Sequence, residues 1–375
     1  MFRIITIIIP HIITILILFL VGLFMPYLTR KEIVFGVRIP QGLRDHAEIE
    51  RIKKVYTRNY LLSVGLPSLF FIILLVIRPD PIIILISIFV LIALLLGNYY
   101  LCHRSLKKIK ADNQWTEGYK ETSVMDIGYR PEKSLVSPWW FALPLGLIML
   151  QIIIVLNHYD SIPEIMPIHY NFHGNPDNWA KKSYRLVLMS PAIEILVTAV
   201  LFLVYKMIGW SKQQLSVEDP EESKIRNQIF RRRWSGFIIF TSVIIILSFF
   251  SMQVSMLKLL DIGFQGMFIA LAVISPMLII VVACWLAFTT GQSGSRIKLD
   301  EKSESQNDKI DRDDDKHWIL GIIYYNPDDP SLFVEHRFGV GWTINVGNRK
   351  AVLGFFGFLV LFSAALFLIM YFSRI

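Results

Sequence analysis

Long apolar runs separated by polar loops set the pattern of this chain. Each of the eight runs is about 17 to 25 residues long, and charged residues almost never interrupt them. A run of that length crosses the hydrocarbon core of a bilayer as a helix, because lipid offers no partner to unsatisfied backbone groups. The pattern therefore predicts an all-α polytopic membrane protein with about eight transmembrane helices, at residues 4–28, 61–77, 82–101, 138–157, 187–208, 235–256, 266–288 and 351–372.

Lys and Arg are unevenly shared between alternate loops. With the loops numbered in chain order, 31 of the 38 Lys and Arg lie in the first, third, fifth and seventh loops, counting Lys206 at the end of its run with the loop that follows. Cytoplasmic loops carry such an excess of positive charge. We therefore expect a multi-pass protein of the cell membrane with the odd loops in the cytoplasm and both the N- and C-termini outside. Contact of these loops with the anionic leaflet of a lipid bilayer explains the net charge of +8, so no nucleic-acid partner is expected.

The first loop carries signals for a short strand followed by a helix. Residues 34–39 favour a strand, and Asp45 with Glu48 three residues later has the spacing of a capping box. Beyond it, apolar residues share one face and basic residues fall mostly elsewhere, as in an interfacial amphipathic helix. We expect this helix to lead into the second span, with an apolar face formed by Ile49, Ile52, Val55 and Tyr56.

Two charged segments of the odd loops have the composition of a solvated surface. Arg231, Arg232 and Arg233 precede Trp234 just before the sixth span, which is typical of a positive-inside stop with an aromatic interface anchor. Residues 291–316 are rich in Ser, Asp and Lys and cannot bury enough apolar surface to offset the ordering entropy, so a flexible linker is predicted. Its acidic run 313–315 is expected to be solvated, with a cation site as the alternative.

Residues 317–350 predict a small β-rich cytoplasmic module. Three strand-like segments, 319–325, 332–338 and 342–346, are separated by the turn signal Asn326-Pro-Asp-Asp-Pro330 and by the glycine pair Gly339 and Gly341. We expect an antiparallel sheet, with residues 34–39 as a candidate additional strand at its exposed edge. No helix begins at the glycines, so a nucleotide-binding loop is excluded.

These features divide the chain into five parts. Transmembrane helices one to three with the first loop occupy 1–110, and helices four to seven with an extracellular motif loop at 158–185 occupy 111–290. The flexible linker (291–316), the β-rich module (317–350) and the eighth helix (351–375) follow. Cys102 falls at the end of one span and Cys284 inside another, so neither is placed for a disulfide.

The extracellular loop 158–185 holds the sharpest motif of the chain. Ile168, Tyr170 and Phe172 alternate with His169, Asn171 and His173, which is the signature of a strand. On a strand the two histidines lie about 13 Å apart, too far to share a metal ion, whereas helical spacing would allow it. We expect a structured turn at Gly174-Asn-Pro-Asp177 with Trp179 at the membrane interface. A surface that binds a peptide or lipid, and a metal site, are the alternatives.

A resemblance to a known family rests on this motif. The pattern Pro-x-His-x-Asn-x-x-Gly-x-Pro-Asp-x-Trp from Pro167 to Trp179, followed by Lys182, resembles the signature of a bacterial membrane-protein family of unknown function related to the SdpI-type immunity and signalling proteins. Residues 318–348, with Phe338-Gly-Val-Gly-Trp342 and Asn345, are similar to a second small uncharacterised domain. Phe35-Gly-Val-Arg38-x-Pro40 is more loosely similar to a Gly-x-Arg-x-Pro motif of SdpI-like proteins. The resemblance implies no established reaction.

Few ionisable residues fall inside the predicted spans. Glu194 in the fifth span is the clearest, and His11 and Gln151 lie in the first and fourth spans. A carboxylate within a span is costly and is therefore a functional candidate. We expect the three side chains to face one another in an outward-opening cavity under the loop 158–185. The alternatives for Glu194 are a protonated acid bonded to a neighbouring helix and a proton or cation site.

The predicted function is non-catalytic, without cofactor or metal: sensing of, or immunity to, an extracellular peptide, toxin or envelope component. The candidate ligand-binding residues are His169, Asn171, His173, Asp177, Trp179 and Lys182. A cytoplasmic regulator is expected to dock at Arg38, Tyr325 and Trp342. The alternative is a proton-coupled transporter in which Glu194 and His11 carry the proton, and a membrane metallohydrolase ranks third.

Overall fold

Membrane-spanning helices form most of the fold. The computed structural model describes residues 8–115, 120–122, 131–170, 176–217, 219–257, 262–299, 309–311, 313–337 and 339–374. Within these ranges, eight helical segments are long and apolar enough to cross a membrane, which confirms the predicted polytopic helical class. The segments comprise α1 (Ile9–Leu28), α2 with α3 (Ala47–Tyr60 and Leu66–Ile77), α4 (Pro81–Asp112), α6 (Ala142–Asn157), α7 with α8 (Tyr184–Val187 and Met189–Trp210), α9 (Pro220–Met256), α10 (Ile262–Thr290) and α11 (Arg349–Arg374).

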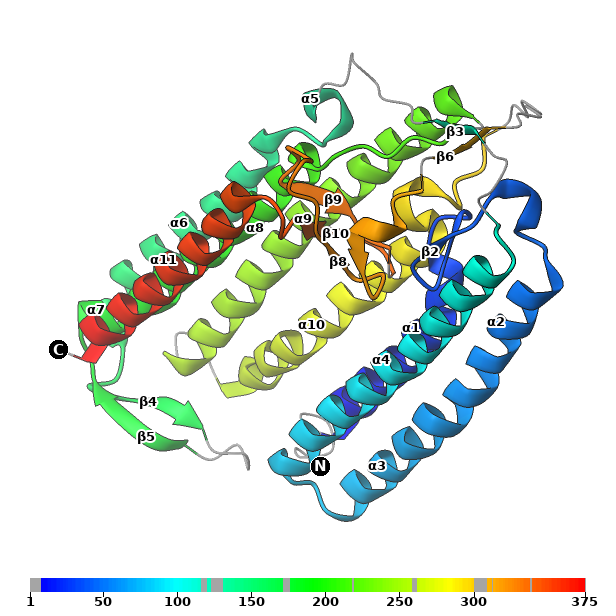
Figure 1. Cartoon of the computed structure of the whole chain (residues 1–375). Coiled ribbons are helices and arrows are strands. Elements are labelled where there is room, and N and C mark those ends of the chain that lie inside the picture. Colours follow the sequence, from blue (N-terminus) through cyan, green and yellow to red (C-terminus); the bar gives the residue numbers. More distant parts are fainter. Residues whose placement is uncertain are drawn as a thin grey trace.

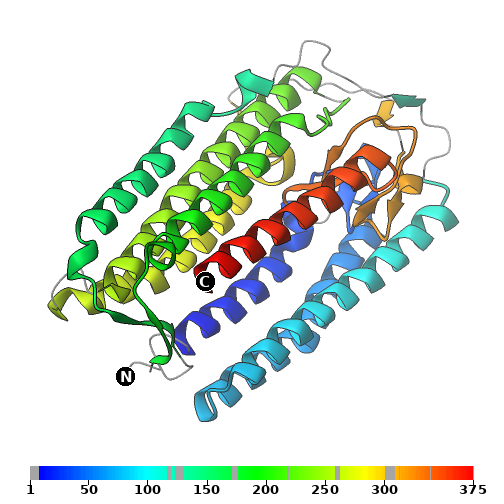
Figure 2. The same cartoon turned by 90° about the vertical axis from the view of Figure 1, so that its left-hand side faces the viewer.

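The helices form two groups that lie side by side (Figure 1). One group contains α1 to α4, and the other contains α6, α8, α9 and α10. Helix α1 contacts α10 across the boundary, and α11 packs against α7 and α8. Figure 2 shows α11 on the outer face of the bundle.

The loops alternate between the two ends of the bundle (Figure 1). One end, called the hairpin end below, carries the strand pair β4 (Ile165–Tyr170) and β5 (Pro176–Lys181), the start of α1 and the end of α11. The other, called the module end, carries strands β1 (Ile33–Val34), β2 (Val37–Arg38) and β7 to β10. The even loops thus lie at the hairpin end and the odd, Lys- and Arg-rich loops at the module end. Which end faces the cytoplasm remains a prediction.

Several helices continue beyond the apolar spans at the module end. Helix α4 has 32 residues and α9 has 37, so both are about 48 Å long or longer, against about 30 Å for a hydrocarbon core. Asp80 caps the start of α4 by accepting a hydrogen bond from the backbone N–H of Ile82 at 2.9 Å, and Pro81 suits the first helical turn. The C-terminal part of α4 and the N-terminal part of α9 therefore lie beyond the hydrocarbon core, next to the module.

Helix α2 differs from the predicted interfacial helix. Its N-cap is His46, not Asp45, because the His46 ring accepts a hydrogen bond from the Glu48 N–H. Through the π-helical turn Leu61–Gly65, α2 runs directly into α3 as one 31-residue segment. Its apolar face packs on the protein core instead of lying flat on a membrane: Ile49, Ile52, Tyr56 and Tyr60 are buried.

The module consists of two short hairpins instead of one three-stranded sheet. Strand β7 (Trp318–Ile319) pairs with β8 (Ile323–Tyr324), and β9 (Phe333–Glu335) pairs with β10 (Trp342–Ile344). A parallel bridge between Tyr324 and Asn345 joins them. The segment expected as one strand reverses because Leu320 and Gly321 both have positive φ, 53° and 69°, as the mirror-image hairpin turns require.

The first loop meets this module through a turn, not through a sheet edge. Strands β1 and β2 form their own hairpin, whose turn residues Phe35 and Gly36 have φ of 46° and 76°. A Cβ atom at Gly36 would lie 2.7 Å from the Gly321 Cα atom, so the two turns touch backbone to backbone. The expected edge strand 34–39 is therefore wrong in its pairing, although the segment does contact the module.

The segment 291–316 is anchored at both ends. The 3-10 turn Gln292–Gly294 is buried, and the Gln292 side-chain amide exchanges two hydrogen bonds with the backbone of Gly341, at 2.9 and 2.7 Å. Residues Lys309–Asp311 form β6, which pairs in parallel with β3 (Lys120–Thr122). Residues 300–308 and 312 lie outside the described part of the chain. The remaining short elements are η2 (Gln41–Leu43), α5 (Pro131–Ser134), η4 (Pro138–Phe141), η5 (Tyr159–Ser161) and η7 (Asp315–His317).

Candidate functional site: the β4–β5 hairpin and the polar cluster beneath it

The motif loop folds into an antiparallel hairpin at the end of the bundle (Figure 1). Ile165 pairs with Lys181, Pro167 with Trp179 and His169 with Asn178. Two register irregularities follow Pro167, which has no N–H to give to the ladder. The strand predicted from the alternation at 168–170 is confirmed. Asn171, His173 and the first two residues of the predicted turn Gly174-Asn-Pro-Asp177 fall in 171–175, outside the described residues, so the metal alternative stays untested; Pro176 and Asp177 begin β5.

The hairpin exposes large apolar side chains. Trp179 is 53% exposed and Ile165 is 59% exposed, and Ile168 is also exposed. Among the described strands, β4 and β5 pair only with each other, so neither outer edge is paired with a further described strand. Unpaired strand edges are templates for the addition of an extended peptide. The hairpin therefore has the chemistry of a recognition surface.

Lys182 fixes the base of the hairpin. Its ammonium donates to the carbonyl oxygens of Ile162 (3.1 Å) and Tyr159 (3.4 Å), pairs with Glu164 (3.1 Å) and lies 5.0 Å above the Tyr159 ring. That ring stacks on Tyr184 at 4.0 Å between centroids. The Lys182 side chain is only 10% exposed. It positions the hairpin and is not itself open to a ligand.

A small apolar core joins the hairpin base to three helices. Met166 of β4 packs with Ile162, Val155 of α6, Val187 of α7 and Leu257 after α9. The Val187 carbonyl oxygen also accepts a hydrogen bond of 2.5 Å from the Gln253 side-chain amide. The hairpin base is thus connected by packing and by a hydrogen bond to the interior of the bundle.

Beneath this base lies a buried polar cluster formed by three helices. The Gln151 amide in α6 donates to Glu194 in α8 at 2.8 Å and to the Gln253 side-chain oxygen in α9 at 2.5 Å. The Ser190 hydroxyl donates to the same Glu194 oxygen at 2.8 Å. Gln151 and Glu194 are fully buried, and Gln253 is buried as well. The prediction that Glu194 faces the interior beside the fourth span is confirmed.

Two oxygens of the cluster lack a partner. Glu194 Oε2 and Gln151 Oε1 are buried and accept no hydrogen bond from the described residues. The groups bonded to Glu194 are a neutral amide and a neutral hydroxyl. An unpaired charge in an apolar interior is costly. The cluster can therefore hold Glu194 as a neutral acid, or as a carboxylate with a bound proton donor or cation.

His11 does not join this cluster. Its ring nitrogen Nε2 bonds Ser87 Oγ at 2.9 Å, between α1 and α4 in the other helix group. The expected meeting of His11, Gln151 and Glu194 is thus half wrong: Gln151 and Glu194 meet, and His11 is elsewhere. Gln253 takes the third place. The rule that selected Gln151, a polar amide inside an apolar span, also applies to Gln253 and could have found it.

At the module end, a second polar site is built from full charges. Asp314 pairs with Arg38 at 3.0 Å and with Arg337, and Lys110 pairs with Asp313 (2.7 Å) and Asp315 (2.6 Å). Arg337 also pairs with Asp315 and donates to the Gly36 carbonyl oxygen at 2.9 Å. Three cations thus face three carboxylates. The sequence predicted that the acidic run 313–315 is solvated. This prediction is wrong, because the three carboxylates are paired with cations.

The charges of this network shift the titration of its carboxylates. Burial alone raises the pKa of Asp314, but the guanidiniums of Arg38 and Arg337 outweigh it and hold the pKa well below the ordinary value. For Asp315, burial likewise raises the pKa, and Arg337 and Lys110 lower it further than burial raises it. Both carboxylates are therefore held in the charged form.

Arg231 extends the ionic layer into the second helix group. It is fully buried, donates to the carbonyl oxygens of Ile208 and Ser211 at the end of α8, and lies 3.6 Å from Glu335. Glu335 also accepts a bond of 2.7 Å from Asn227. Arg232 and Arg233 are exposed as predicted, whereas Arg231 is buried and caps a helix C-terminus instead of belonging to the solvated surface.

The predicted docking residues differ in their surroundings. Arg38 is buried in the ionic network, and Trp342 packs against Phe230 of α9 at 5.4 Å between ring centroids. Tyr325 is exposed. Of the three, only Tyr325 has an exposed side chain, so docking of a regulator at Arg38 and Trp342 stays a prediction. Cys102 and Cys284 are both free thiols.

Two family models match the chain, one over the hairpin and polar cluster and the other over part of the module. Residues 146–195 match a domain of unknown function, DUF1648, and residues 327–352 match a family of unknown function, DUF5808. No curated protein and no solved structure matches the chain. The first match begins five residues before Gln151 and ends one after Glu194, so it spans the hairpin together with Gln151, Ser190 and Glu194 of the polar cluster. The second covers part of the module and the start of α11. Both matched families are uncharacterised.

Proposed function

We propose that the protein is a non-catalytic membrane receptor or immunity protein whose β4–β5 hairpin binds an extracellular peptide, toxin or envelope component. The proposal places the hairpin end outside the cell and the module end in the cytoplasm, in agreement with the excess of Lys and Arg in the module-end loops. It also agrees with the resemblance of the motif to SdpI-type immunity and signalling proteins.

The exposed apolar face of the tethered hairpin is the observation that carries this proposal. Trp179 and Ile165 are exposed at the end of the bundle, next to strand edges that no described strand covers. Aromatic anchors and free backbone edges together bind extended peptides. Lys182 and the core around Met166 already hold the hairpin base, so its fixation does not depend on the exposed side chains. Anchoring of Trp179 at the membrane interface is the alternative role of this side chain.

The polar cluster gives ligand binding a route into the bundle. A shift of the hairpin base would move the Val187 carbonyl, whose partner Gln253 also bonds Gln151. Helix α9, which carries Gln253, also carries Arg231 and Asn227 at the module end. The rigid helix thus connects the hairpin to the residues that hold Glu335 of the module. Docking of a cytoplasmic regulator is the readout that this connection suggests.

The test is protection of a deletion strain against envelope-active peptides. The strain is complemented with the wild-type protein, Trp179→Ala, or the matched control Trp139→Ala. Trp139 is 83% exposed in η4, away from the hairpin. The proposal expects Trp179→Ala to lose protection and Trp139→Ala to keep it, at equal protein levels in the membrane. A second variant of the hairpin, His169→Ala, is tested in the same way. Full protection by both single variants contradicts the proposal.

A second candidate function rests on the partnerless oxygen of Glu194. In a proton-coupled transporter this carboxyl takes up and releases the proton, without the help of His11, which lies in the other helix group. In the described conformation Glu194 is sealed from solvent, so transport needs a further conformation that opens the cluster to water.

Proton flux in proteoliposomes separates the two candidates. A transporter loses flux in Glu194→Gln, which keeps the shape and hydrogen bonding of the side chain and cannot titrate, and retains it in Glu221→Gln at the exposed start of α9. A receptor shows no flux in any of these proteins. A Glu194→Gln protein that inserts correctly and protects cells fully removes the transporter reading.

A further inference from the structure

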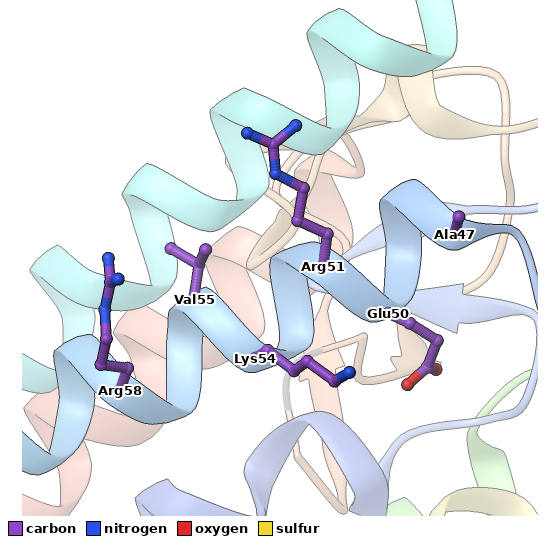
Figure 3. Close-up of a pocket in the computed structure, with 6 residues that line it drawn as sticks. All are labelled: Ala47, Glu50, Arg51, Lys54, Val55 and Arg58. Atoms are coloured by element: carbon purple, nitrogen blue, oxygen red, sulfur yellow. The ribbon is translucent and has the colours of Figure 1, made fainter.

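The outer face of α2 carries a row of basic side chains at the module end. Arg51, Lys54 and Arg58 follow one another at intervals of three and four residues, so they share one side of the helix. With Val55, Ala47 and Glu50 they line an open pocket of about 460 Å³. Figure 3 shows Arg51 and Arg58 extending in the same direction with Val55 between them, whereas the Lys54 side chain extends along the helix on the side of Glu50.

The charge of this pocket is strongly positive. The pocket holds three cations and one carboxylate, Glu50, and that carboxylate already bonds Lys53 at 2.7 Å. The Arg51 side chain is 74% exposed, and its ion pair with Glu48 is long, 3.6 Å. Lys54 forms no ion pair with the residues that the structure describes. The pocket therefore offers cationic donors to an anion from outside the chain.

The same helix becomes lipid-facing immediately after the basic row. Leu61, Leu62, Leu66 and Leu69 are between 46% and 61% exposed, on a helix that belongs to a membrane span. At a rise of 1.5 Å per residue, Arg58 lies only about 5 Å from the first of these leucines, and Arg51 about 10 Å further out. The headgroup layer on each side of the hydrocarbon core is about 5–8 Å thick. The backbone of Arg58 thus lies within this layer, and that of Lys54, about 10 Å from the first leucine, lies just beyond it, from where a long lysine side chain can reach back to the phosphates.

We propose that the pocket formed by Arg51, Lys54, Val55 and Arg58 binds one anionic glycerophospholipid of the surrounding leaflet. The phosphate and the anionic headgroup bind the three cations, and an acyl chain runs along the exposed leucines of the same helix. The continuity of the cationic pocket with an apolar, lipid-facing surface favours a lipid over an acidic protein, which would have no use for the leucines.

A neighbouring set of charges provides a matched control. Helix α4 packs beside α2 and carries three exposed basic residues at its module end, Arg104, Lys107 and Lys108. They match the pocket in charge and lie on the adjacent helix, but they do not line the pocket. If the pocket is a specific site, removal of its cations weakens lipid binding more than removal of the α4 cations does. If the surface is only diffusely positive, the two sets of substitutions weaken binding equally.

The experiment measures lipid binding to the purified full-length protein in a neutral detergent by native mass spectrometry. Short-chain phosphatidylglycerol and phosphatidylcholine are titrated into the wild type, R51Q/K54Q/R58Q and R104Q/K107Q/K108Q. Each surface cation contributes about fivefold to the binding of anionic lipid, so the pocket variant is expected to bind phosphatidylglycerol about a hundredfold more weakly. The α4 variant is expected to retain a bound phosphatidylglycerol within about fivefold of the wild type.

Several results overturn the proposal. Equal losses in the two triple variants indicate a diffuse surface, and equal binding of phosphatidylcholine and phosphatidylglycerol indicates a site without charge selectivity. Displacement of the lipid by millimolar inorganic phosphate indicates a site for a free anion. If the triple variant does not fold, Lys54→Gln alone replaces it, with an expected loss of about fivefold; binding unchanged in that variant also counts against the site.

Discussion

The two ends of the bundle bury polar groups in opposite ways. At the module end, Arg337 and its neighbours place three cations against three carboxylates, so each charge meets an opposite one. At the hairpin end, Glu194 is surrounded by neutral groups, and one of its oxygens has no partner among the described residues. Buried charges are tolerated where they are paired, and unpaired ones persist where a function needs them.

This difference assigns different roles to the two sites. The ionic network joins the first loop, α4 and the module into one body, and each of its charged groups is paired with an opposite charge. The polar cluster contributes less to stability, because it contains few hydrogen bonds. It leaves one oxygen of a titratable group, Glu194, without a hydrogen-bond partner among the described residues. We therefore expect substitutions in the network to act on folding and substitutions in the cluster to act on function. The predictions below test that division, from the largest expected effect to the smallest.

Breaking the ionic network should have the largest effect. Arg337→Met leaves Asp314 and Asp315 with fewer cations in a buried setting and removes the bond to Gly36. Loss of one partner of a buried ion pair costs about 3–5 kcal/mol. Thermal unfolding in detergent should show a much lower Tm for this variant, and Arg232→Met, on an exposed arginine, should leave Tm unchanged. A wild-type Tm for Arg337→Met contradicts the assignment of the network to stability.

Acid should weaken the same network. The pKa of Asp314 and of Asp315 is lowered in the folded protein by the neighbouring cations. The stabilisation is therefore complete above the ordinary carboxyl pKa of about 4 and is lost as the pH falls below it toward the lowered values. Tm measured between pH 7 and pH 3 should fall at the acid end, and Asp314→Asn should show a shallower fall. Equal slopes for the two proteins speak against this origin.

Glu194 substitutions should separate shape from charge. Glu194→Leu removes the acceptor of the Ser190 hydroxyl and one of the two acceptors of the Gln151 amide, and should cost about 1–3 kcal/mol of unfolding free energy. Glu194→Gln can keep these bonds and should change the unfolding free energy by less than about 1 kcal/mol. Urea or heat unfolding of both proteins in the same detergent checks the pair. A Gln variant as unstable as the Leu variant shows that the carboxyl itself holds the fold.

The hairpin surface should matter least for stability. Trp179→Ala removes an exposed side chain, and such changes stay within about 0.5 kcal/mol. Lys182→Met removes the bonds that fix the hairpin base and should cost about 1–2 kcal/mol or less, confined to local opening of the hairpin. Hydrogen exchange of β4 and β5 should accelerate in Lys182→Met and not in Trp179→Ala. Equal exchange rates in both contradict the role of Lys182 as the anchor.

The spans and the hairpin could be predicted because their signals are local. A run of apolar residues specifies a span by its own length, and the alternation around His169 specifies a strand within a few residues. Glu194 facing inward also follows from the cost of exposing a charge to lipid. These features need no knowledge of distant partners.

The ionic network could not be predicted in this way. The N–H of Arg38 bonds the Asp315 carboxylate across 277 residues, and no local pattern distinguishes that aspartate from a solvated one. The same holds for Arg231, whose burial depends on Glu335 and on the end of α8. Three aspartates in a polar segment look like a linker until the cations that neutralise them are placed beside them.

The orientation of the hairpin tests the account most directly, because a binding surface for an extracellular ligand must face outside. Single cysteines are introduced at Asn178 in β5 and at Lys316 in η7, both exposed, in a background without Cys102 and Cys284. A membrane-impermeant thiol reagent is applied to intact cells and to permeabilised ones. We predict labelling of residue 178 in intact cells and of residue 316 only after permeabilisation. Labelling of residue 316 but not of residue 178 in intact cells contradicts the account.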